Sequence, residues 1–342
     1  METADERAKP IMGPAPHSEA WLNIRKYDPD RKDRPVVIGA SQAAAACNLD
    51  PYSSPLQLYL EARGEYEREF DDDAKERMLM GLRLEPVILD CYADKMEVTV
   101  ERGLPMYFHP KNKYVAATPD GLACPGIGLD EWCVDAKATN WRMVDASGQD
   151  ENKFGRSGTD EVPMQYLCQA QVQMAVMGMD RCDFPVLSDG RQLLVYTVDR
   201  NEDLLNNILD SMTELGERIV NGDPPEPTWE HSGTAKALSR MFGCEVGKAT
   251  LLGTEEQDMW QEYESLGRVI KNANERRDVI KNKLTWEMGD SQFGIFPSGK
   301  IRLKRISVGS SVYTEEDVRE IQLKIGQTKR AGYKFIRAVK AE

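Results

Sequence analysis

The stretch that most constrains the fold is residues 132–138, which read Trp-Cys-Val-Asp-Ala-Lys-Ala. This short, mostly apolar run is typical of a strand, and side chains two apart on a strand point the same way. We therefore expect Asp135 and Lys137 to project together while Val134, Ala136 and Ala138 face the core. A second predicted strand, residues 114–118, leads directly into Pro119-Asp120-Gly121, and a turn joins the two strands. Antiparallel neighbours joined by a turn would place Asp120 near Asp135.

Two aspartates at the ends of adjacent strands can hold Mg²⁺, a hard ion that prefers oxygen ligands. Such an ion lowers the pKa of a water molecule, which can then attack a phosphodiester. Lys137 would orient that water or stabilise the charge that develops on the phosphate. Glu85, on a helix predicted over residues 71–95, could add a ligand. An Asp-x-Lys triplet is weak evidence by itself, because such a pair more often marks a solvated strand edge.

A predicted helix that starts at Pro163 carries two different stripes. Tyr166, Gln169 and Gln173 share a polar face, and the apolar face holds Leu167, Ala170, Met174 and Met177. The polar stripe could reach into a phosphate site, or it could be an ordinary exposed helix face.

The composition predicts a folded protein with more than one part. The chain has 342 residues, 41% of them hydrophobic, and a net charge of −13. Residues 298–342 hold 11 Lys and Arg against 5 Asp and Glu, which leaves −19 on the remainder. The acidic total therefore does not exclude nucleic acid, because a nuclease needs only a locally basic groove.

The seven cysteines include no C-x-x-C pair, and there are three scattered histidines. This pattern favours reduced thiols over a disulfide framework or a zinc site, and it disfavours a Ser-His-Asp enzyme. No apolar run is long enough to span a bilayer and residues 1–10 lack a signal-peptide core, so we expect a cytoplasmic protein without membrane contact.

Turn and cap signals divide the chain into three parts. Residues 1–20 read as a flexible arm, residues 21–228 as the main domain, and residues 229–342 as an appendage after the Pro-rich segment 221–227. Ser41 is a candidate N-cap for a helix over residues 42–47, and Ser54 with Pro55 opens another helix. Residue 86, a proline inside the predicted helix 71–95, would kink or restart it.

The appendage has its own pattern. Residues 254–288 show heptad spacing, which indicates an antiparallel helical pair or a helix laid on a neighbour. A hairpin over residues 292–306 and a helix over residues 314–325 follow. Basic side chains of this region would hold DNA or form a solvated face; they include Lys300, Arg302, Lys304 and Arg305.

Several motifs in one order resemble the YqaJ-type viral recombinase family, the lambda-exonuclease-like branch of the PD-(D/E)xK nucleases. The matching motifs are the segment 38–61, Met80-Gly81 with Glu85, Thr118-Pro119-Asp120-Gly121, Asp135-x-Lys137, and Tyr166-x-x-Gln169 followed by Gly178. They cover roughly residues 21–227. The resemblance implies an α/β (α+β) restriction-endonuclease-like core, in which helices flank a mixed central β-sheet, with the helix and hairpin appendage outside it.

The resemblance also implies an activity. Members digest linear double-stranded DNA 5′ to 3′ with Mg²⁺, for which Mn²⁺ can substitute, and leave 3′ single strands for a phage annealing protein. A processive member would encircle DNA as a homo-oligomeric ring. Related nucleases with an iron–sulfur cluster carry a close group of cysteines, which this chain lacks, so we expect no cluster.

Carried over by motif, the expected metal ligands are Asp120, Asp135 and the Ala136 carbonyl, with Glu85 at the helical acid position. Lys137 is the expected catalytic lysine, and Gln169 and Tyr166 line the site. Trp21, Arg25 and Ser41 match a pocket for a terminal 5′-phosphate.

Two departures from the family pattern stand out. Asp135 replaces the usual glutamate, so this carboxylate must sit closer to a metal. The segment between Arg25 and Ser41 is also longer than in the family, which leaves Arg31 or Arg34 as alternatives to Arg25.

Three functions remain open at this level: the 5′–3′ exonuclease, a structure- or end-specific endonuclease of repair or defence, and a DNA-binding or recruiting protein with a degenerate site. Intact Asp120, Asp135 and Lys137 disfavour the third.

Overall fold

The computed structural model describes residues 10–16, 18–145, 150, 152–243, 245–297 and 301–304. The chain forms two compact units, Met1–Gly243 and Cys244–Glu342. No helix in the described part of the chain combines the length and the apolar character that crossing a bilayer requires.

The smaller sheet of the first unit has four strands in the order β1-β4-β5-β2. Strand β2 (Ile38–Gly39) runs parallel to β5 (Val115–Ala117), which pairs with β4 (Tyr107–Phe108) antiparallel. Strand β1 (Ile11–Met12) completes it against β4, and Gly13 donates a backbone hydrogen bond to Met106. The described part of the predicted flexible arm is therefore fastened to the sheet by backbone hydrogen bonds.

The larger sheet has the order β10-β9-β7-β6-β3, and β8 also pairs with β9. Its strands are β3 (Thr99–Arg102), β6 (Gly121–Cys124), β7 (Trp132–Val134), β8 (Lys137–Thr139), β9 (Arg181–Ser188) and β10 (Gln192–Asp199). Strands β7 and β8 run parallel to β9, whereas the other neighbours are antiparallel. The mixed pairing that the sequence predicts is present, but the strands divide between two sheets rather than one.

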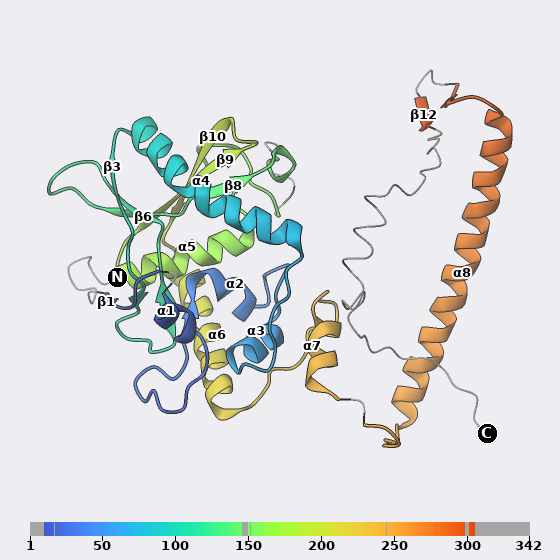
Figure 1. Ribbon diagram of the computed structural model, residues 1–342, viewed down its shortest axis with the longest axis horizontal. Helices are drawn as coiled ribbons and strands as arrows, with labels where there is room; N and C mark the ends of the chain where they lie inside the picture. Colours follow the sequence, from blue (N-terminus) through green and yellow to red (C-terminus); the bar gives the residue numbers. More distant parts are fainter. Residues whose placement is uncertain are drawn as a thin grey trace, which may run out of the picture. The chain divides into compact units, whose positions relative to one another are not determined.

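Two long helices enclose the larger sheet, as Figure 1 shows. Helix α4 (Asp72–Met96) contacts β3, β8, β9 and β10, and α5 (Met164–Met177) contacts β7, β9 and β10. Side-chain alternation explains the two layers: Trp132 and Val134 pack with Tyr92 of α4, whereas Cys133 packs with Met174 of α5. Helix α4 is continuous through Pro86, so the predicted restart of the helix is absent.

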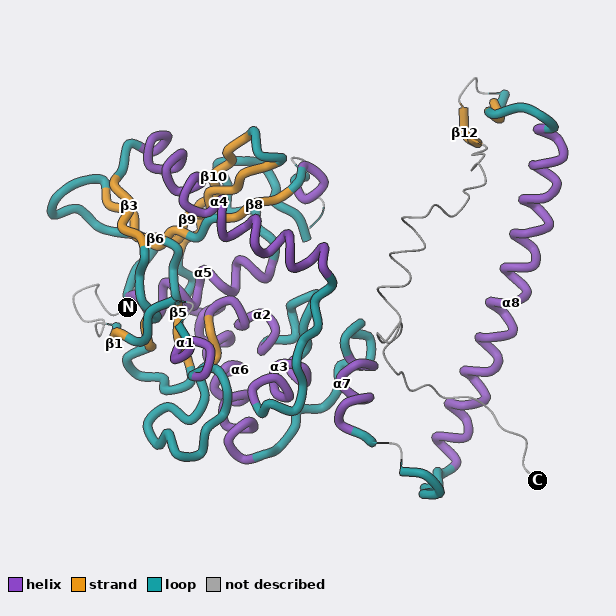
Figure 2. The backbone as a smooth tube through the Cα atoms, in the orientation of Figure 1, coloured by secondary structure: helices purple, strands orange, loops and turns teal. Residues whose placement is uncertain are grey.

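The remaining helices gather on the other side of α5 (Figure 2). They are α1 (Glu19–Asn23), η2 (Ala40–Gln42), α2 (Ala43–Ala46), α3 (Pro55–Ala62), α6 (Glu202–Asn221) and α7 (Thr234–Met241), whereas the short η3 (Trp141–Met143) follows β8 directly. Helices α2 and α6 contact α5, and α3 contacts α6 and α7. The start of α3 follows the predicted rule, because the Ser54 side chain accepts from the Gln57 backbone and Pro55 occupies the first turn.

The first unit extends to Gly243, beyond the Pro-rich segment where the sequence predicts a boundary. The cause is α7, whose Ala237 is fully buried in the same core as α2 and α3. The second unit contains α8 (Thr254–Met288) and the antiparallel pair β11 (Phe293–Ile295) and β12 (Ile301–Lys304). The predicted helix over residues 314–325 lies outside the described residues.

Candidate functional site

Strand pairing brings the two predicted aspartates together. Strands β6 and β7 pair with Gly121 opposite Val134, which puts the preceding Asp120 across from the following Asp135. The prediction of proximity is confirmed, but its reason was wrong, because the partner strand is β6, which follows Asp120, and not β5. The run 132–138 is also broken at residues 135–136 between β7 and β8, and Ala138 is exposed rather than in the core.

Glycine at position 121 is required by this close pairing. A Cβ atom there would lie 2.6 Å from Val100 Cγ1 and 3.2 Å from the Glu101 carbonyl oxygen on the neighbouring strand β3. A larger residue would push β3 and β6 apart next to Asp120. The Asp-Gly pair is therefore a packing requirement of the sheet as well as a possible chemical motif.

Asp135 is held by three side chains and is almost fully buried, with 1% of its surface exposed. Lys137 Nζ forms an ion pair with Asp135 Oδ1. The amides of Gln169 and Gln173, both on α5, donate to Oδ2 at 2.5 and 2.6 Å. The polar stripe of α5 therefore points into the site, and the alternative of an exposed helix face is wrong, since Gln169 and Gln173 are buried.

Gln173 was not among the predicted site residues, although it lies on the predicted polar stripe. Its amide oxygen accepts from the thiol of buried Cys182 at 3.3 Å, which turns the amide nitrogen toward Asp135. The sequence signal for this role is the i, i+4 spacing from Gln169, because residues four apart lie on the same helix face.

Lys137 projects beside Asp135, as the strand pattern predicts. Its ammonium lies 5.0 Å from the centre of the Tyr166 ring and 5.9 Å from that of Phe184. Burial alone would lower the pKa of Lys137, but the carboxylates of Asp135 and Asp120 raise it above the ordinary value, so the side chain is charged at neutral pH.

The Tyr166 ring lies next to the Lys137 ammonium and is not part of the cleft wall. Its ring stacks on Phe154 with centroids 5.3 Å apart. Burial raises the pKa of the Tyr166 hydroxyl.

Asp120 stands in a crowded acidic environment. One oxygen accepts a hydrogen bond from the Ala136 backbone N–H at 2.8 Å. Burial raises the pKa of Asp120 well above its usual range, and the nearby carboxylates of Asp135 and Glu85 act in the same direction, against Lys137. A cluster of this kind carries more negative charge than its one lysine balances.

This donor set fits a hard divalent cation, which would relieve the repulsion between oxygen donors. Asp120 and Asp135, with Glu85 at the cleft wall, are the residues that would hold it. Within the described residues, no three Asp, Glu, His or Cys side chains converge as a preformed metal site. Ala136 contributes its N–H to Asp120, and the position of its carbonyl toward an ion stays a prediction.

These residues line one cleft of about 410 Å³. Its wall includes Asp120, Asp135, Lys137, Gln169, Gln173 and Glu85, and also Arg25, Ser41, Trp21 and Thr118. The predicted acidic site and the predicted phosphate pocket are therefore parts of the same cavity.

Arg25 also lines this cleft. Its guanidinium lies over the Trp21 ring, 3.9 Å from the centroid, and the Trp21 indole N–H donates to Thr118 at 3.3 Å. A Cβ at Gly39 would come within 3.1 Å of Arg25 Nη2, so glycine leaves room for the guanidinium. The buried Nε of Arg25 has no hydrogen-bond partner among the described residues, and burial lowers the pKa of Arg25 to about 10.

The two alternatives to Arg25 are engaged elsewhere. Arg31 pairs with Asp28 at 3.2 Å and donates to the Pro35 carbonyl, which closes the longer loop on itself. Arg34 donates to the carbonyls of His109 and Asn112. Neither lines the cleft, so Arg25 is the arginine that shares a cavity with Ser41.

Ser41 lies at the cleft but is not a helix N-cap. The cap position belongs to Gly39, whose N–H donates to the side chain of Gln42 at 3.0 Å, and Ser41 lies inside η2. The helix that follows, α2, has only four residues. The hydroxyl of Ser41, rather than a helix dipole, is what this position offers to the cleft.

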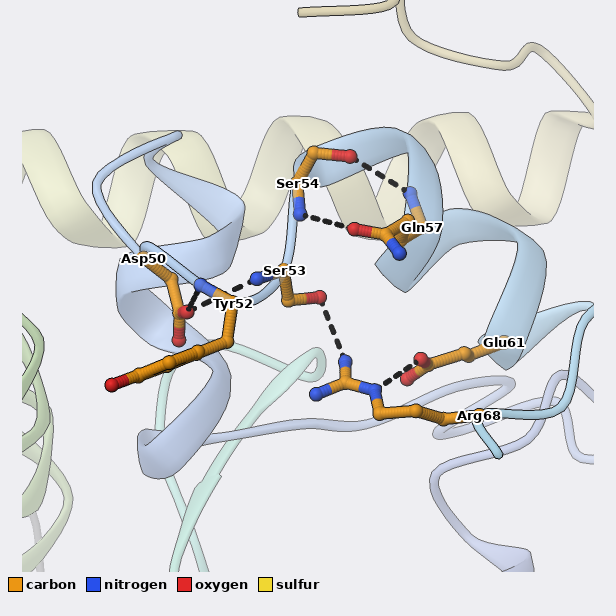
Figure 3. A network of polar contacts seen from close by, with 7 residues as sticks. All are labelled: Asp50, Tyr52, Ser53, Ser54, Gln57, Glu61 and Arg68. Atoms are coloured by element: carbon orange, nitrogen blue, oxygen red, sulfur yellow. Dashed lines mark hydrogen bonds and ion pairs between the residues drawn. The ribbon is translucent and has the colours of Figure 1, made fainter. Parts of the chain in front are cut away.

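A loop next to the site is held by its own polar network (Figure 3). Asp50 accepts from the backbone N–H groups of Tyr52 and Ser53 at 2.6 and 3.1 Å. Arg68 donates to Ser53 at 2.8 Å and to Glu61 at 2.9 Å. Besides burial, Asp50 and Tyr52 are close enough to Tyr166 to raise the pKa of its hydroxyl. The network therefore fixes the loop beside Tyr166, the residue that contacts Lys137.

The predicted DNA-binding basic residues belong to the second unit. Lys300 and Arg305 lie outside the described residues. Arg302 and Lys304 belong to β12, but their side chains lie outside what the structure describes. Their role in binding stays a prediction.

Fold and site define a class: a mixed α/β protein with a carboxylate–lysine centre and an arginine in one cleft. Residues 20–180 match the model of the YqaJ-like viral recombinase domain. This part of the chain therefore resembles a YqaJ-like viral recombinase domain, as the motifs predict.

Solved structures give more distant likenesses. An alkaline exonuclease (LHK-Exo) from Laribacter hongkongensis aligns at 19% identity with a TM-score of 0.41, over 55% of this chain and 89% of that one. Its complex with dAMP gives 18% and 0.43, over 59% and 91%. A phage-related exonuclease from Haemophilus somnus 129PT gives 11% and 0.37, over 55% and 96%. No curated protein sequence matches the chain, and the resemblance to the family rests on the domain match.

Proposed function

We propose that this protein is a Mg²⁺-dependent exonuclease that digests linear double-stranded DNA from its 5′ ends and leaves 3′ single strands. One observation carries the proposal: the carboxylate–lysine centre and the unpartnered Nε of Arg25 line the same cleft. Cleavage of a phosphodiester requires only the catalytic centre. An enzyme that starts at a 5′ end benefits from a second anion site, because binding of the terminal phosphate there sets which phosphodiester reaches the catalytic centre. The match to the YqaJ-like viral recombinase domain and the helices that flank a mixed sheet support the same proposal.

Magnesium, held by Asp120 and Asp135, would supply a lowered water pKa and positive charge next to the scissile phosphate. Lys137 stays protonated beside Asp135 and presents its ammonium to the phosphate as negative charge develops there. Gln169 and Gln173 keep the Asp135 carboxylate oriented, so its geometry does not depend on the substrate.

In the same cleft, Arg25 and Ser41 would bind a terminal 5′-phosphate. The guanidinium lies over the Trp21 ring, and its Nε–H has no partner among the described residues and can donate to an anion. A phosphate bound there would fix which phosphodiester reaches Asp120 and Lys137, and would give the enzyme its preference for ends.

The proposed activity also implies an assembly, a partner protein, a location and an alternative metal. We propose a homo-oligomeric ring around DNA, a single-strand annealing protein that receives the product, a cytoplasmic location and Mn²⁺ as a substitute metal. Each is tested separately from the chemistry.

The decisive experiment follows linear duplexes labelled separately at each 5′ and 3′ end, with Mg²⁺ and with EDTA. We expect early Mg²⁺-dependent release of the 5′ label and late release of the 3′ label. Covalently closed circular DNA is the matched control. Cutting of the circle would favour the endonuclease alternative, and binding without any cleavage would favour the degenerate one.

A further inference from the structure

Helix α8 is a long helix whose side chains are exposed along its whole length. None of its 35 residues is buried. Large apolar side chains are nonetheless open to solvent along it, including Met259 at 55%, Leu266 at 54% and Ile270 at 60%. Contiguous exposed apolar surface of this kind usually marks an interaction site.

The apolar residues of α8 form a single seam. They are Met259, Tyr263, Leu266, Ile270, Ala273, Ile280 and Leu284, in alternating steps of four and three, with Arg277 as the one polar member. This spacing keeps one face of a helix in contact with a partner helix over its whole length. Val269 and Val279 are exposed but lie beside the seam or away from it.

Charge is distributed unevenly along the same helix. Residues 254–270 hold five Asp and Glu and one Arg, a net charge of −4, whereas residues 271–288 hold five Lys and Arg and three Asp and Glu, a net of +2. Two copies side by side in the same direction would place like charges together. Two copies in opposite directions place each acidic half on a basic half.

We propose that α8 binds α8 of a second copy of this chain as an antiparallel two-helix coiled coil. The heptad positions define the register, in which Met259 faces Leu284, Tyr263 faces Ile280 and Ile270 faces Ala273 of the other copy. Every such contact occurs twice, because the interface has two-fold symmetry.

The positions that flank the seam agree with this register. Glu262 of one copy faces Lys283 of the other, so the interface gains two ion pairs of opposite charge. A parallel pair would instead bring Glu262 beside Gly267, which forms no ion pair. It would also bring Arg276 beside Lys281, and these two positive charges would repel each other. Arg277 faces Leu266, where its aliphatic stem covers apolar surface and its charge stays in water.

The first test compares two neighbouring β-branched residues of equal exposure, Ile280 in the seam and Val279 outside it, both 44% exposed. The full-length chain and the variants Ile280→Lys and Val279→Lys are examined by sedimentation equilibrium over a wide range of concentration. Ile280→Lys should raise the dissociation constant by about tenfold or more, and Val279→Lys should leave it unchanged. Equal masses for wild type and Ile280→Lys at every concentration would overturn the proposal, and this includes the case in which α8 packs within its own chain.

The second test checks direction and register without a core substitution. Glu262→Lys and Lys283→Glu should each weaken association, more at low salt than at high salt, and the double variant should restore it. Additive loss in the double variant would reject the antiparallel register. Because both residues are exposed on α8, the helix itself is kept, which far-UV circular dichroism of each variant verifies.

Discussion

The carboxylate of Asp135 has both oxygens occupied by protein donors, whereas Asp120 is bound by one backbone N–H. Aspartate at position 135 therefore places a short carboxylate deep in the site. Lys137, Gln169 and Gln173 converge on it there. Asp120 and Glu85 line the same cleft as Asp135.

Removing the ammonium of Lys137 should abolish cleavage. We expect Lys137→Ala to lower the rate by about 100-fold or more, because one preorganised group that stabilises transition-state charge is worth that much. Digestion of end-labelled linear DNA in Mg²⁺ is the measurement. Lys153→Ala, which removes a surface partner of Asp150, is the control and should cut at the wild-type rate. A Lys137→Ala enzyme with wild-type rates would remove Lys137 from the mechanism.

Neutralising Asp120 should stabilise the metal-free protein while it removes activity. Its folded-state pKa is raised, so its contribution is most favourable below the usual pKa and is lost as pH rises through the raised value. At neutral pH its charge opposes folding. Asp120→Asn keeps the oxygen that accepts from Ala136 and removes that charge.

Thermal unfolding in EDTA should therefore show a melting temperature a few degrees higher for Asp120→Asn than for wild type. Adding Mg²⁺ should raise the melting temperature of wild type but not of the variant, since ligand binding to the native state stabilises it. An equal Mg²⁺ response in both proteins would argue against Asp120 as a ligand.

Arg25 should control the preference for phosphorylated ends. Arg25→Ala should slow digestion of 5′-phosphorylated duplexes and change little on 5′-hydroxyl duplexes, because only the former offers the anion. The matched variant is Arg34→Ala, whose guanidinium binds backbone carbonyls outside the cleft. Initial rates on the two substrates give the ratio for each variant. Equal slowing of both substrates by Arg25→Ala would refute a 5′-phosphate pocket.

At the scale of elements, the layers behind the site include a buried network that the sequence does not reveal. Asp183 is fully buried on β9 and accepts from Tyr92, Arg181 and Thr197. The Tyr92 hydroxyl also accepts from the Trp132 indole at 2.8 Å. This network ties α4 to β7 and β9, the strands that carry or adjoin Asp135.

Tyr92→Phe should destabilise the fold by about 1–3 kcal/mol, because the buried Trp132 N–H and Asp183 each lose a partner. Chemical denaturation measures the loss, and Tyr114→Phe, another buried tyrosine, is the control with a smaller expected effect. Activity of Tyr92→Phe below its unfolding transition should stay near wild type, since the hydroxyl does not line the cleft. Equal stability of both variants would show that the network adds little.

Elements with strong local signals could be predicted from the sequence, whereas their pairing could not. Helix α8 has the predicted bounds because its heptads and flanking residues carry a periodic signal over ten turns or so. Strands β5 and β6 follow one another in the chain yet belong to different sheets. Nothing in a three- or four-residue strand states which distant strand it will join.

The site also has parts that the sequence could predict and parts that it could not. The order of the motifs predicted Asp120, Asp135 and Lys137 as site residues, and the structure places them together. The role of Gln173 depends on Cys182, which lies on β9 and meets α5 only after folding. The cap prediction for Ser41 was wrong because the helical run begins at Ala40, so Gly39 holds the cap position and Ser41 lies inside the first turn.

At the scale of the whole molecule, two C-terminal truncations should separate the contribution of α7 to stability from the contribution of the second unit to DNA binding. Residues 228–234 dock on the loop of Figure 3: Thr228 donates to Asn48, and His231 meets the Asp50 carbonyl at 3.1 Å. Ala237 of α7 is fully buried. A chain that ends at Pro227 loses these contacts, whereas one that ends at Gly243 keeps them.

We therefore expect the 1–243 chain to retain the melting temperature of the first unit and Mg²⁺-dependent cleavage. It should bind DNA more weakly and with a smaller dependence on salt, because it lacks the basic residues of the appendage. The 1–227 chain should melt several degrees lower than 1–243, because it exposes the surface that α7 covers. Scanning calorimetry and salt-titrated binding to a linear duplex measure both effects. DNA affinity and salt slope equal to those of the full chain would assign DNA binding to the first unit alone.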